Sequence, residues 1–348
     1  MKSKFPLSKL INLTLDRAMK DSKKVICFGL GATDPKGIFG TTLNLEKKFG
    51  SGRVFDVPAS ENALTGFAIG CSLNNKIPIL VHQRLDFALL SIDQIFNGAA
   101  KWLYMFGGKH NVPITIRMII GRGWGQGPTH SQNLHSVFGH IPGLKVVTAS
   151  LPEDTTHLLY SSIFDPNPVI FLEHRWLHNS IGSMPSRLKK DQLNKCKIIK
   201  KGKDITLIGL SYMTLECLEA SKILKKFNID CEVLDIRTVS PLDFKTILLS
   251  VNKTKRAIIT DTSNNFCGLS STISNNIYQN IKNLKSKNEI ISIPFCPEPT
   301  ANSLVNYFYN DRYTIVNKVF KSLKINNKMN IPKNIKSDVP GDWFKGPF

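Results

Sequence analysis

Residues 57–70 read VPASENALTGFAIG, and this stretch predicts the start of a helix built from small residues. Ser60 is a favourable N-cap residue, and a carboxylate at Glu61, in the first turn, complements the helix dipole. On this stretch alone, Glu61 is either ordinary helix chemistry or an acid held at the edge of a binding site. The neighbouring sequence decides between the two.

Short runs of β-branched and aliphatic residues alternate with helical patterns on both sides of this helix. Strands that alternate with helices form a largely parallel sheet that is covered on both faces. The sequence therefore predicts an α/β fold. Its predicted strands are 24–29, 112–120, 144–148, 169–172, 205–210, 231–236, 257–260 and 290–293.

A chain of 348 residues with 42% apolar residues exceeds one ordinary core and predicts two domains. The polar, lysine-rich stretch 174–203 has few periodic apolar residues and is typical of an interdomain linker. We place the domains at 1–190 and 191–325, followed by a tail at 326–348 that is rich in Asn, Lys and Pro. The apolar stripe of residues 88–105 predicts one buried helix.

The bulk composition limits the function classes. The seven cysteines are scattered without a C-x-x-C pair, which is typical of reduced thiols in the cytosol. No apolar stretch is long enough to span a membrane, and residues 7–18 form an amphipathic pattern instead of a signal-peptide core. We expect a cytoplasmic protein. The formal charge of +20 is spread over short lysine runs, so a solvated surface is favoured over a nucleic-acid site, although an acidic partner remains an alternative.

A glycine-rich loop at 121–132 contains His130 near its end. The loop lacks the lysine of a P-loop and the fixed glycine spacing of a dinucleotide site. A histidine at the end of such a loop could be exposed and free to transfer protons, or it could simply cap the next helix. His130, His135 and His140 are five residues apart and so do not share the helical face that metal ligands would need.

Five segments in order resemble one family. They match the beta subunit of the decarboxylating component of 2-oxo acid dehydrogenase complexes, of which pyruvate dehydrogenase and branched-chain 2-oxo acid dehydrogenase are the best-known members. The similarity is collinear from about residue 7 to 322. The segments are 56–70, 93–108, 127–132, 140–147 and 233–243.

The resemblance implies two three-layer α/β/α domains, a transketolase-type pyrimidine-binding domain followed by a transketolase C-terminal domain. It makes Glu61 the acid that hydrogen-bonds the aminopyrimidine of thiamine diphosphate and so helps to activate this cofactor. It makes Phe87 the aromatic residue that packs on the pyrimidine, unless Phe87 is an ordinary core residue. His130 would face the reactive carbon of the cofactor and assist acyl transfer.

The resemblance also implies a structural potassium site built largely from backbone oxygens, as suits a hard cation. The same loop could equally be a plain connection between strands. The implied ligands are Ile114, Ser162, Ile163, Asp165 and Asn167.

The sequence contains no Gly-Asp-Gly, the signature of the Mg²⁺ and diphosphate site in thiamine enzymes. The resemblance therefore implies that an alpha subunit supplies this half of the site in an α2β2 heterotetramer. It further implies a 2-oxo acid substrate, oxidative decarboxylation, and transfer of the acyl group to lipoamide on a lipoyl acyltransferase. We expect no membrane or nucleic-acid partner.

Three segments depart from the family pattern. They are 79–83, where relatives carry an acidic residue, 29–33, where they carry Gly-Glu-Asp, and 260–265, where they carry a glutamate. These departures leave a specialised-pathway thiamine enzyme as an alternative. Two further alternatives are the C-terminal half of a split transketolase, which would act on a sugar phosphate, and a non-enzymatic basic binding protein.

Overall fold

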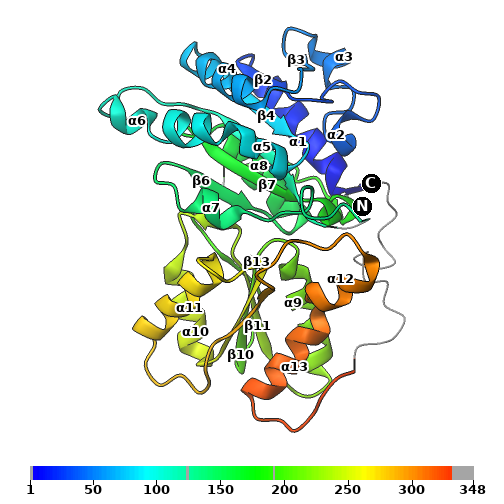
Figure 1. Cartoon of the computed structure of the whole chain (residues 1–348), viewed down its shortest axis with the longest axis vertical. Helices are drawn as coiled ribbons and strands as arrows, with labels where there is room; N and C mark the ends of the chain where they lie inside the picture. Colours follow the sequence, from blue (N-terminus) through cyan, green and yellow to red (C-terminus); the bar gives the residue numbers. More distant parts are fainter. Residues whose placement is uncertain (1–2, 123–124, 191–192, 331–348) are drawn as a thin grey trace. The chain divides into compact units, whose positions relative to one another are not determined.

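The computed structural model describes residues 3–122, 125–190 and 193–330. The chain forms two compact units (Figure 1). Of the described residues, the first contains 3–121, 129–190 and 193, and the second contains 194–330 together with 122 and 125–128. The second unit thus includes five described residues of the glycine-rich loop that the sequence assigned to the first domain. Of the predicted tail, residues 331–348 lie outside the described residues.

The core of the first unit is a parallel sheet. Its neighbouring strands follow the order β6-β7-β5-β4-β2-β3. Nearly every residue of these strands is buried, which explains their continuous apolar sequences. The strands are β2 (Val25–Phe28), β3 (Val54–Phe55), β4 (Ile77–His82), β5 (Thr115–Ile120), β6 (Lys145–Thr148) and β7 (Val169–His174).

Helices cover this sheet. The predicted amphipathic start is confirmed as α1, which buries Leu7, Leu10, Ile11, Leu15 and Ala18 and packs against α8. The helices are α1 (Leu7–Asp21), α2 (Gly37–Gly40), α3 (Leu45–Phe49), α4 (Glu61–Leu73), α5 (Leu85–Ala88), α6 (Trp102–Met105), α7 (His135–Gly139) and α8 (Pro152–Ile163).

The helix predicted at 88–105 is helical for nearly its whole length but is not one regular α-helix. The chain instead forms a 3₁₀ turn η1 (Leu89–Ser91), a π-helical segment η2 (Gln94–Ala99) and the short α6. The segment η2 packs against α4, and a Cβ at Gly98 would lie 3.1 Å from the side chain of Ile69. The lack of a side chain at Gly98 allows this close approach, which an apolar stripe does not reveal.

The predicted linker is also partly wrong. Residues 175–183 form the 3₁₀ segment η3 (Arg175–Asn179) and the strand β8 (Ile181–Ser183), which pairs antiparallel with β1 (Lys4–Pro6). Trp176 and Leu177 are buried, so this stretch belongs to the core of the first unit. Its few apolar residues are not periodic, and the sequence pattern therefore missed them.

The second unit contains a sheet with strand order β14-β13-β10-β11-β9, parallel except for the β9 edge. Helices α10 and α11 lie on one side of this sheet and α9 and α13 on the other (Figure 1). The strands are β9 (Lys197–Lys200), β10 (Ile205–Gly209), β11 (Cys231–Asp235), β13 (Ala257–Asn264) and β14 (Glu289–Ile293), with β12 (Thr238–Ser240) following β11. The helices are α9 (Met213–Lys225), α10 (Phe244–Thr254), α11 (Leu269–Asn280), α12 (Asn302–Phe308) and α13 (Arg312–Ser322).

Every strand predicted from the sequence is present to within three residues at its start and four at its end. No described helix combines the length and the hydropathy needed to cross a membrane.

Candidate active site

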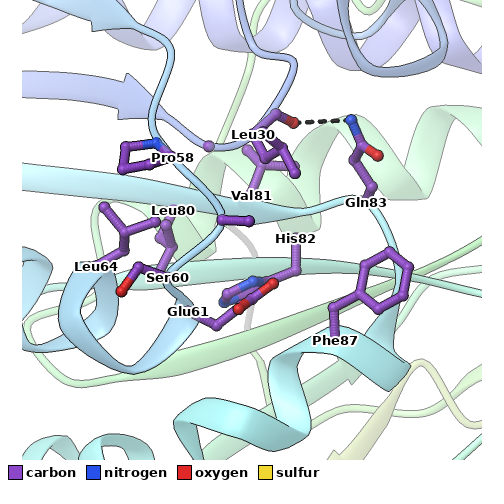
Figure 2. A pocket seen from close by; sticks show the side chains of 12 residues that line it. Leu30, Pro58, Ser60, Glu61, Leu64, Leu80, Val81, His82, Gln83 and Phe87 are labelled. Carbon is purple, nitrogen blue, oxygen red and sulfur yellow. Dashed lines mark hydrogen bonds between the residues drawn. The ribbon is translucent and has the colours of Figure 1, made fainter.

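A pocket of the first unit lies at the carboxyl ends of β2, β3 and β4. In open parallel sheets, ligands bind at this edge. The pocket has about 320 Å³ of empty space, part of it open to solvent. Its walls come from the loop after β2, the loop before α4, the end of β4 and the helix α5 (Figure 2). The lining residues are Gly29, Leu30, Pro58, Ala59, Ser60, Glu61, Leu64, Leu80, Val81, His82, Gln83 and Phe87.

Hydrogen bonds join the loops of this pocket. Asp56, which follows β3, accepts a hydrogen bond from the amide of Gly31 at 2.8 Å. The side-chain amide of Gln83, which follows β4, donates to the backbone carbonyl of Leu30 at 2.9 Å (Figure 2). Only glycine fits at position 29, because a Cβ there would collide with the carbonyl of Val81. The loop after β2 is therefore fixed against the ends of β3 and β4.

Glu61 begins α4 and is half-buried in the pocket wall. Ser60 occupies the N-cap position as predicted, but within the described residues its side chain makes no capping hydrogen bond. Thr65 donates to the backbone carbonyl of Glu61 at 2.8 Å, and the side chain of Glu61 lines the pocket (Figure 2). The carboxylate is thus held on a helix terminus, where it can exchange a proton with a bound ligand.

The structure brings Phe87 and His130 together. Their rings form an edge-to-face contact with centroids 5.3 Å apart and planes at 89°. The motif after His130 is tied to the same helix, since the side chain of Gln132 donates to Asp86 at 2.8 Å. Thr129 Oγ1 lies 3.0 Å from His130 Nδ1. Phe87 lines the pocket with Glu61, so the three predicted site residues lie in one region.

His82 was not predicted as a site residue. It ends β4, is 5% exposed, and its side chain lies on the side of the strand where Glu61 and Phe87 are found (Figure 2). Its Nε2 has no hydrogen-bond partner among the described residues. Burial lowers the pKa of His82 to about 4, so the imidazole is neutral near pH 7. A histidine ending an apolar strand was the available sequence signal.

The five residues implied as potassium ligands lie near the amino ends of the strands, away from the pocket at the carboxyl ends. Ile114 precedes β5, and Asp165 and Asn167 precede β7. The carboxylate of Asp165 accepts hydrogen bonds from Lys145 at 2.6 and 2.7 Å. The carbonyl of Ile114 accepts a hydrogen bond from the amide of Val169, and the carbonyl of Ser162 accepts from the amides of Phe164 and Asp165. Asn167 Oδ1 is buried without a partner among the described residues. A cation here would use Asn167 Oδ1 and the remaining lone pairs of the carbonyls, while Lys145 neutralises Asp165.

Within the described residues, no group of three or more His, Cys, Asp or Glu side chains could hold a metal ion. Near the pocket, the first unit has an acid, Glu61, an aromatic ring, Phe87, and two histidines, His82 and His130. These groups fit a heteroaromatic ligand with ring nitrogens, since it can stack on an aromatic side chain and share protons with an acid.

Two family models match the chain. The transketolase pyrimidine binding domain covers residues 3–179, and the transketolase C-terminal domain covers residues 194–315. The beta subunit of acetoin:2,6-dichlorophenolindophenol oxidoreductase from Cupriavidus necator is 36% identical over 93% of this chain and 99% of its own. The chain belongs to the family of beta subunits of thiamine-diphosphate-dependent 2-oxo acid dehydrogenases and acetoin oxidoreductases.

Other relatives support this family. The beta subunit of the pyruvate dehydrogenase E1 component from Rickettsia bellii is 33% identical over 89% of this chain and 98% of its own. The mitochondrial beta subunit of 2-oxoisovalerate dehydrogenase from Dictyostelium discoideum is 39% identical over 74% and 70%. The predicted fold of two α/β domains with parallel sheets is confirmed.

A solved structure described as a split gene transketolase, inactive beta4 tetramer, matches with a TM-score of 0.72 over 93% of this chain and 99% of that one. Its sequence identity is 18%, so the likeness shows the fold alone. The family uses thiamine diphosphate, and the beta-subunit names of the relatives imply an alpha-subunit partner.

Proposed function

We propose that the chain is the beta subunit of a thiamine-diphosphate-dependent 2-oxo acid dehydrogenase. Together with an alpha subunit in an α2β2 heterotetramer, it would decarboxylate a 2-oxo acid oxidatively and pass the acyl group to lipoamide on a lipoyl acyltransferase. The observation that carries the proposal is the pocket in which Glu61 and Phe87 face one space, with His130 in contact with Phe87.

The residues of the pocket fit the pyrimidine ring of the cofactor. When bound, thiamine diphosphate supplies a carbon nucleophile and an electron sink for breaking the bond next to an oxo group. Glu61 would hold a proton at a ring nitrogen, Phe87 would offer an apolar face to the ring, and the orphaned Nε2 of His82 would find a polar partner. The Mg²⁺ and diphosphate half of the site would come from the alpha subunit.

His130 would serve the substrate end of the site. Its ring rests on Phe87, and the bond from Gln132 to Asp86 holds the following residues in place. A histidine held in this way can give or take a proton as the acyl group forms and leaves, a role worth about 10²- to 10⁴-fold in rate for a general acid or base. The potassium site at Ile114, Ser162, Ile163, Asp165 and Asn167 would stabilise the loop before β7.

A second candidate substrate is acetoin. The Cupriavidus necator relative, named for acetoin and 2,6-dichlorophenolindophenol, matches this chain over nearly the full length of both. Cleavage of acetoin also breaks a carbon–carbon bond beside an oxo group, so the same residues would serve. This candidate agrees with the specialised-pathway alternative considered above.

The test is turnover by the assembled enzyme. The chain is co-expressed with a candidate alpha subunit, and reduction of 2,6-dichlorophenolindophenol is followed with pyruvate, a branched 2-oxo acid, acetoin and a ketose phosphate. We expect turnover that requires thiamine diphosphate with a 2-oxo acid, whereas preference for acetoin would select the second candidate. Turnover of the ketose phosphate alone, or of no compound by a cofactor-loaded complex, would contradict the dehydrogenase proposal.

A further inference from the structure

His82 is held in the pocket at an energetic cost. A buried polar atom without a hydrogen bond destabilises a protein, and a leucine or phenylalanine at this strand end would avoid that cost. Leu80, two residues earlier, lines the same pocket from the same face of β4 and is apolar. The imidazole at position 82 is therefore the exception in an otherwise apolar strand face.

The position of His82 points to a ligand. The side chain is 95% buried, lines the pocket together with Glu61 and Phe87, and keeps Nε2 without a partner in the described part of the chain. The backbone around it is held in the sheet, because His82 pairs with Met118 of β5, and β4 also pairs with β2 as far as Leu80. The ring cannot easily move to find another partner, so a group entering the pocket would complete its hydrogen bonding.

We propose that His82 is a cofactor-binding residue whose Nε2 hydrogen-bonds the aminopyrimidine group that Glu61 also engages. This inference rests on the proposed function. Because burial keeps the imidazole neutral, Nε2 can donate or accept according to its tautomer, and so it can match either a ring nitrogen or an amino group. His82 would thus add a second polar contact to the pyrimidine and fix its orientation in the pocket.

Calorimetric titration of thiamine diphosphate with Mg²⁺ into the assembled alpha–beta complex tests this role. Phenylalanine keeps the ring shape without nitrogen, whereas the amide of glutamine reaches the position of Nε2. We expect His82→Phe to weaken cofactor binding roughly 5- to 50-fold, the loss of a buried hydrogen bond whose partner stays unsatisfied, and His82→Gln to stay within about 3-fold of wild type. His140→Phe, which removes an exposed histidine, is the control and should not change binding.

A second measurement needs no variant and covers the case in which His82→Phe does not fold. Hydrogen–deuterium exchange at the imidazole C2 position, followed by mass spectrometry, reports on each histidine of the wild-type complex. Cofactor binding should slow exchange at His82 several-fold and leave His140 unchanged. Equal binding by wild type and His82→Phe, equal weakening by Phe and Gln, or exchange at His82 that ignores the cofactor would overturn the inference. A wild-type complex that binds no cofactor would instead reject the proposed function.

Discussion

Replacing Glu61 by glutamine is expected to lower kcat of the assembled enzyme by about 10²- to 10⁴-fold, the range for loss of a positioned general acid or base. Glutamine keeps the shape of the side chain but cannot exchange a proton with a ring nitrogen. The fold should survive, because Glu61 is only half-buried and the hydrogen bond from Thr65 uses its backbone carbonyl, which glutamine keeps. The measurement is kcat with the best substrate of the panel, alongside the melting temperature of the variant.

The chain offers a matched control in Glu46. This residue also lies in the first turn of a helix, α3. Like Glu61 it is half-buried, but it does not line the pocket. Glu46→Gln should keep wild-type kcat within about 2-fold, as expected for a surface change of under 0.5 kcal/mol. If the two variants lost the same activity, helix electrostatics and not the pocket would explain Glu61.

Replacing Arg117 by methionine, or Glu173 by glutamine, is expected to destabilise the first unit by about 3–5 kcal/mol. Arg117 Nε lies 2.5 Å and Nη2 2.9 Å from the two carboxylate oxygens of Glu173, and both side chains are buried. His178 Nε2 lies 3.1 Å from the same carboxylate. Removing one partner leaves a buried charge uncompensated, and Tm should fall by roughly 6–20 °C for a unit of this size.

The pH dependence gives this prediction a second readout. Burial raises the pKa of Glu173, but Arg117 and His178 outweigh it and lower the pKa to about 2. Because the folded pKa lies below the unfolded value near 4.5, the contribution of Glu173 is complete above pH 4.5 and is lost as the pH falls toward 2. Glu173→Gln should therefore flatten the acid dependence of unfolding between pH 4.5 and 2.

The exposed pair of Arg17 and Asp21 is the control for the buried pair. Its atoms lie 2.9 Å apart, but the side chains are 60% and 28% exposed. Arg17→Ala should change the free energy of unfolding by less than about 1 kcal/mol. A similar decrease in the free energy of unfolding at both pairs would show that burial of the Arg117–Glu173 pair does not increase its effect on stability.

Much of this molecule follows from its sequence. Most of the buried strands are runs of mainly apolar residues, so their positions and the α/β class could be predicted, but the central strand β4 was not among the predicted strands. Glu61 and His130 stand in segments that resemble a known family, Phe87 matches the aromatic residue of that family, and the structure brings the three into one region. Short edge strands such as β3 and β8 were missed, because two or three residues carry too little periodicity to be recognised.

The rest depends on contacts between distant residues. The π-helical η2 contains Gly98, which lies against the side chain of Ile69, and no local pattern encodes that contact. The role of Gly29 likewise appears only when the carbonyl of Val81 is beside it. His82 lies in an apolar strand, and only its burial without a partner for Nε2 among the described residues marks it as a site residue.

The central claim is that this chain supplies the pyrimidine half of a thiamine diphosphate site that an alpha subunit completes. The most direct measurement is equilibrium binding of the cofactor with Mg²⁺ to the chain alone, to the assembled complex, and to the complex carrying Glu61→Gln. We predict one cofactor per beta chain in the complex, weak binding to the chain alone, and weakened binding in the variant. Binding that is equally tight without the alpha subunit, or that does not respond to Glu61, would contradict the account.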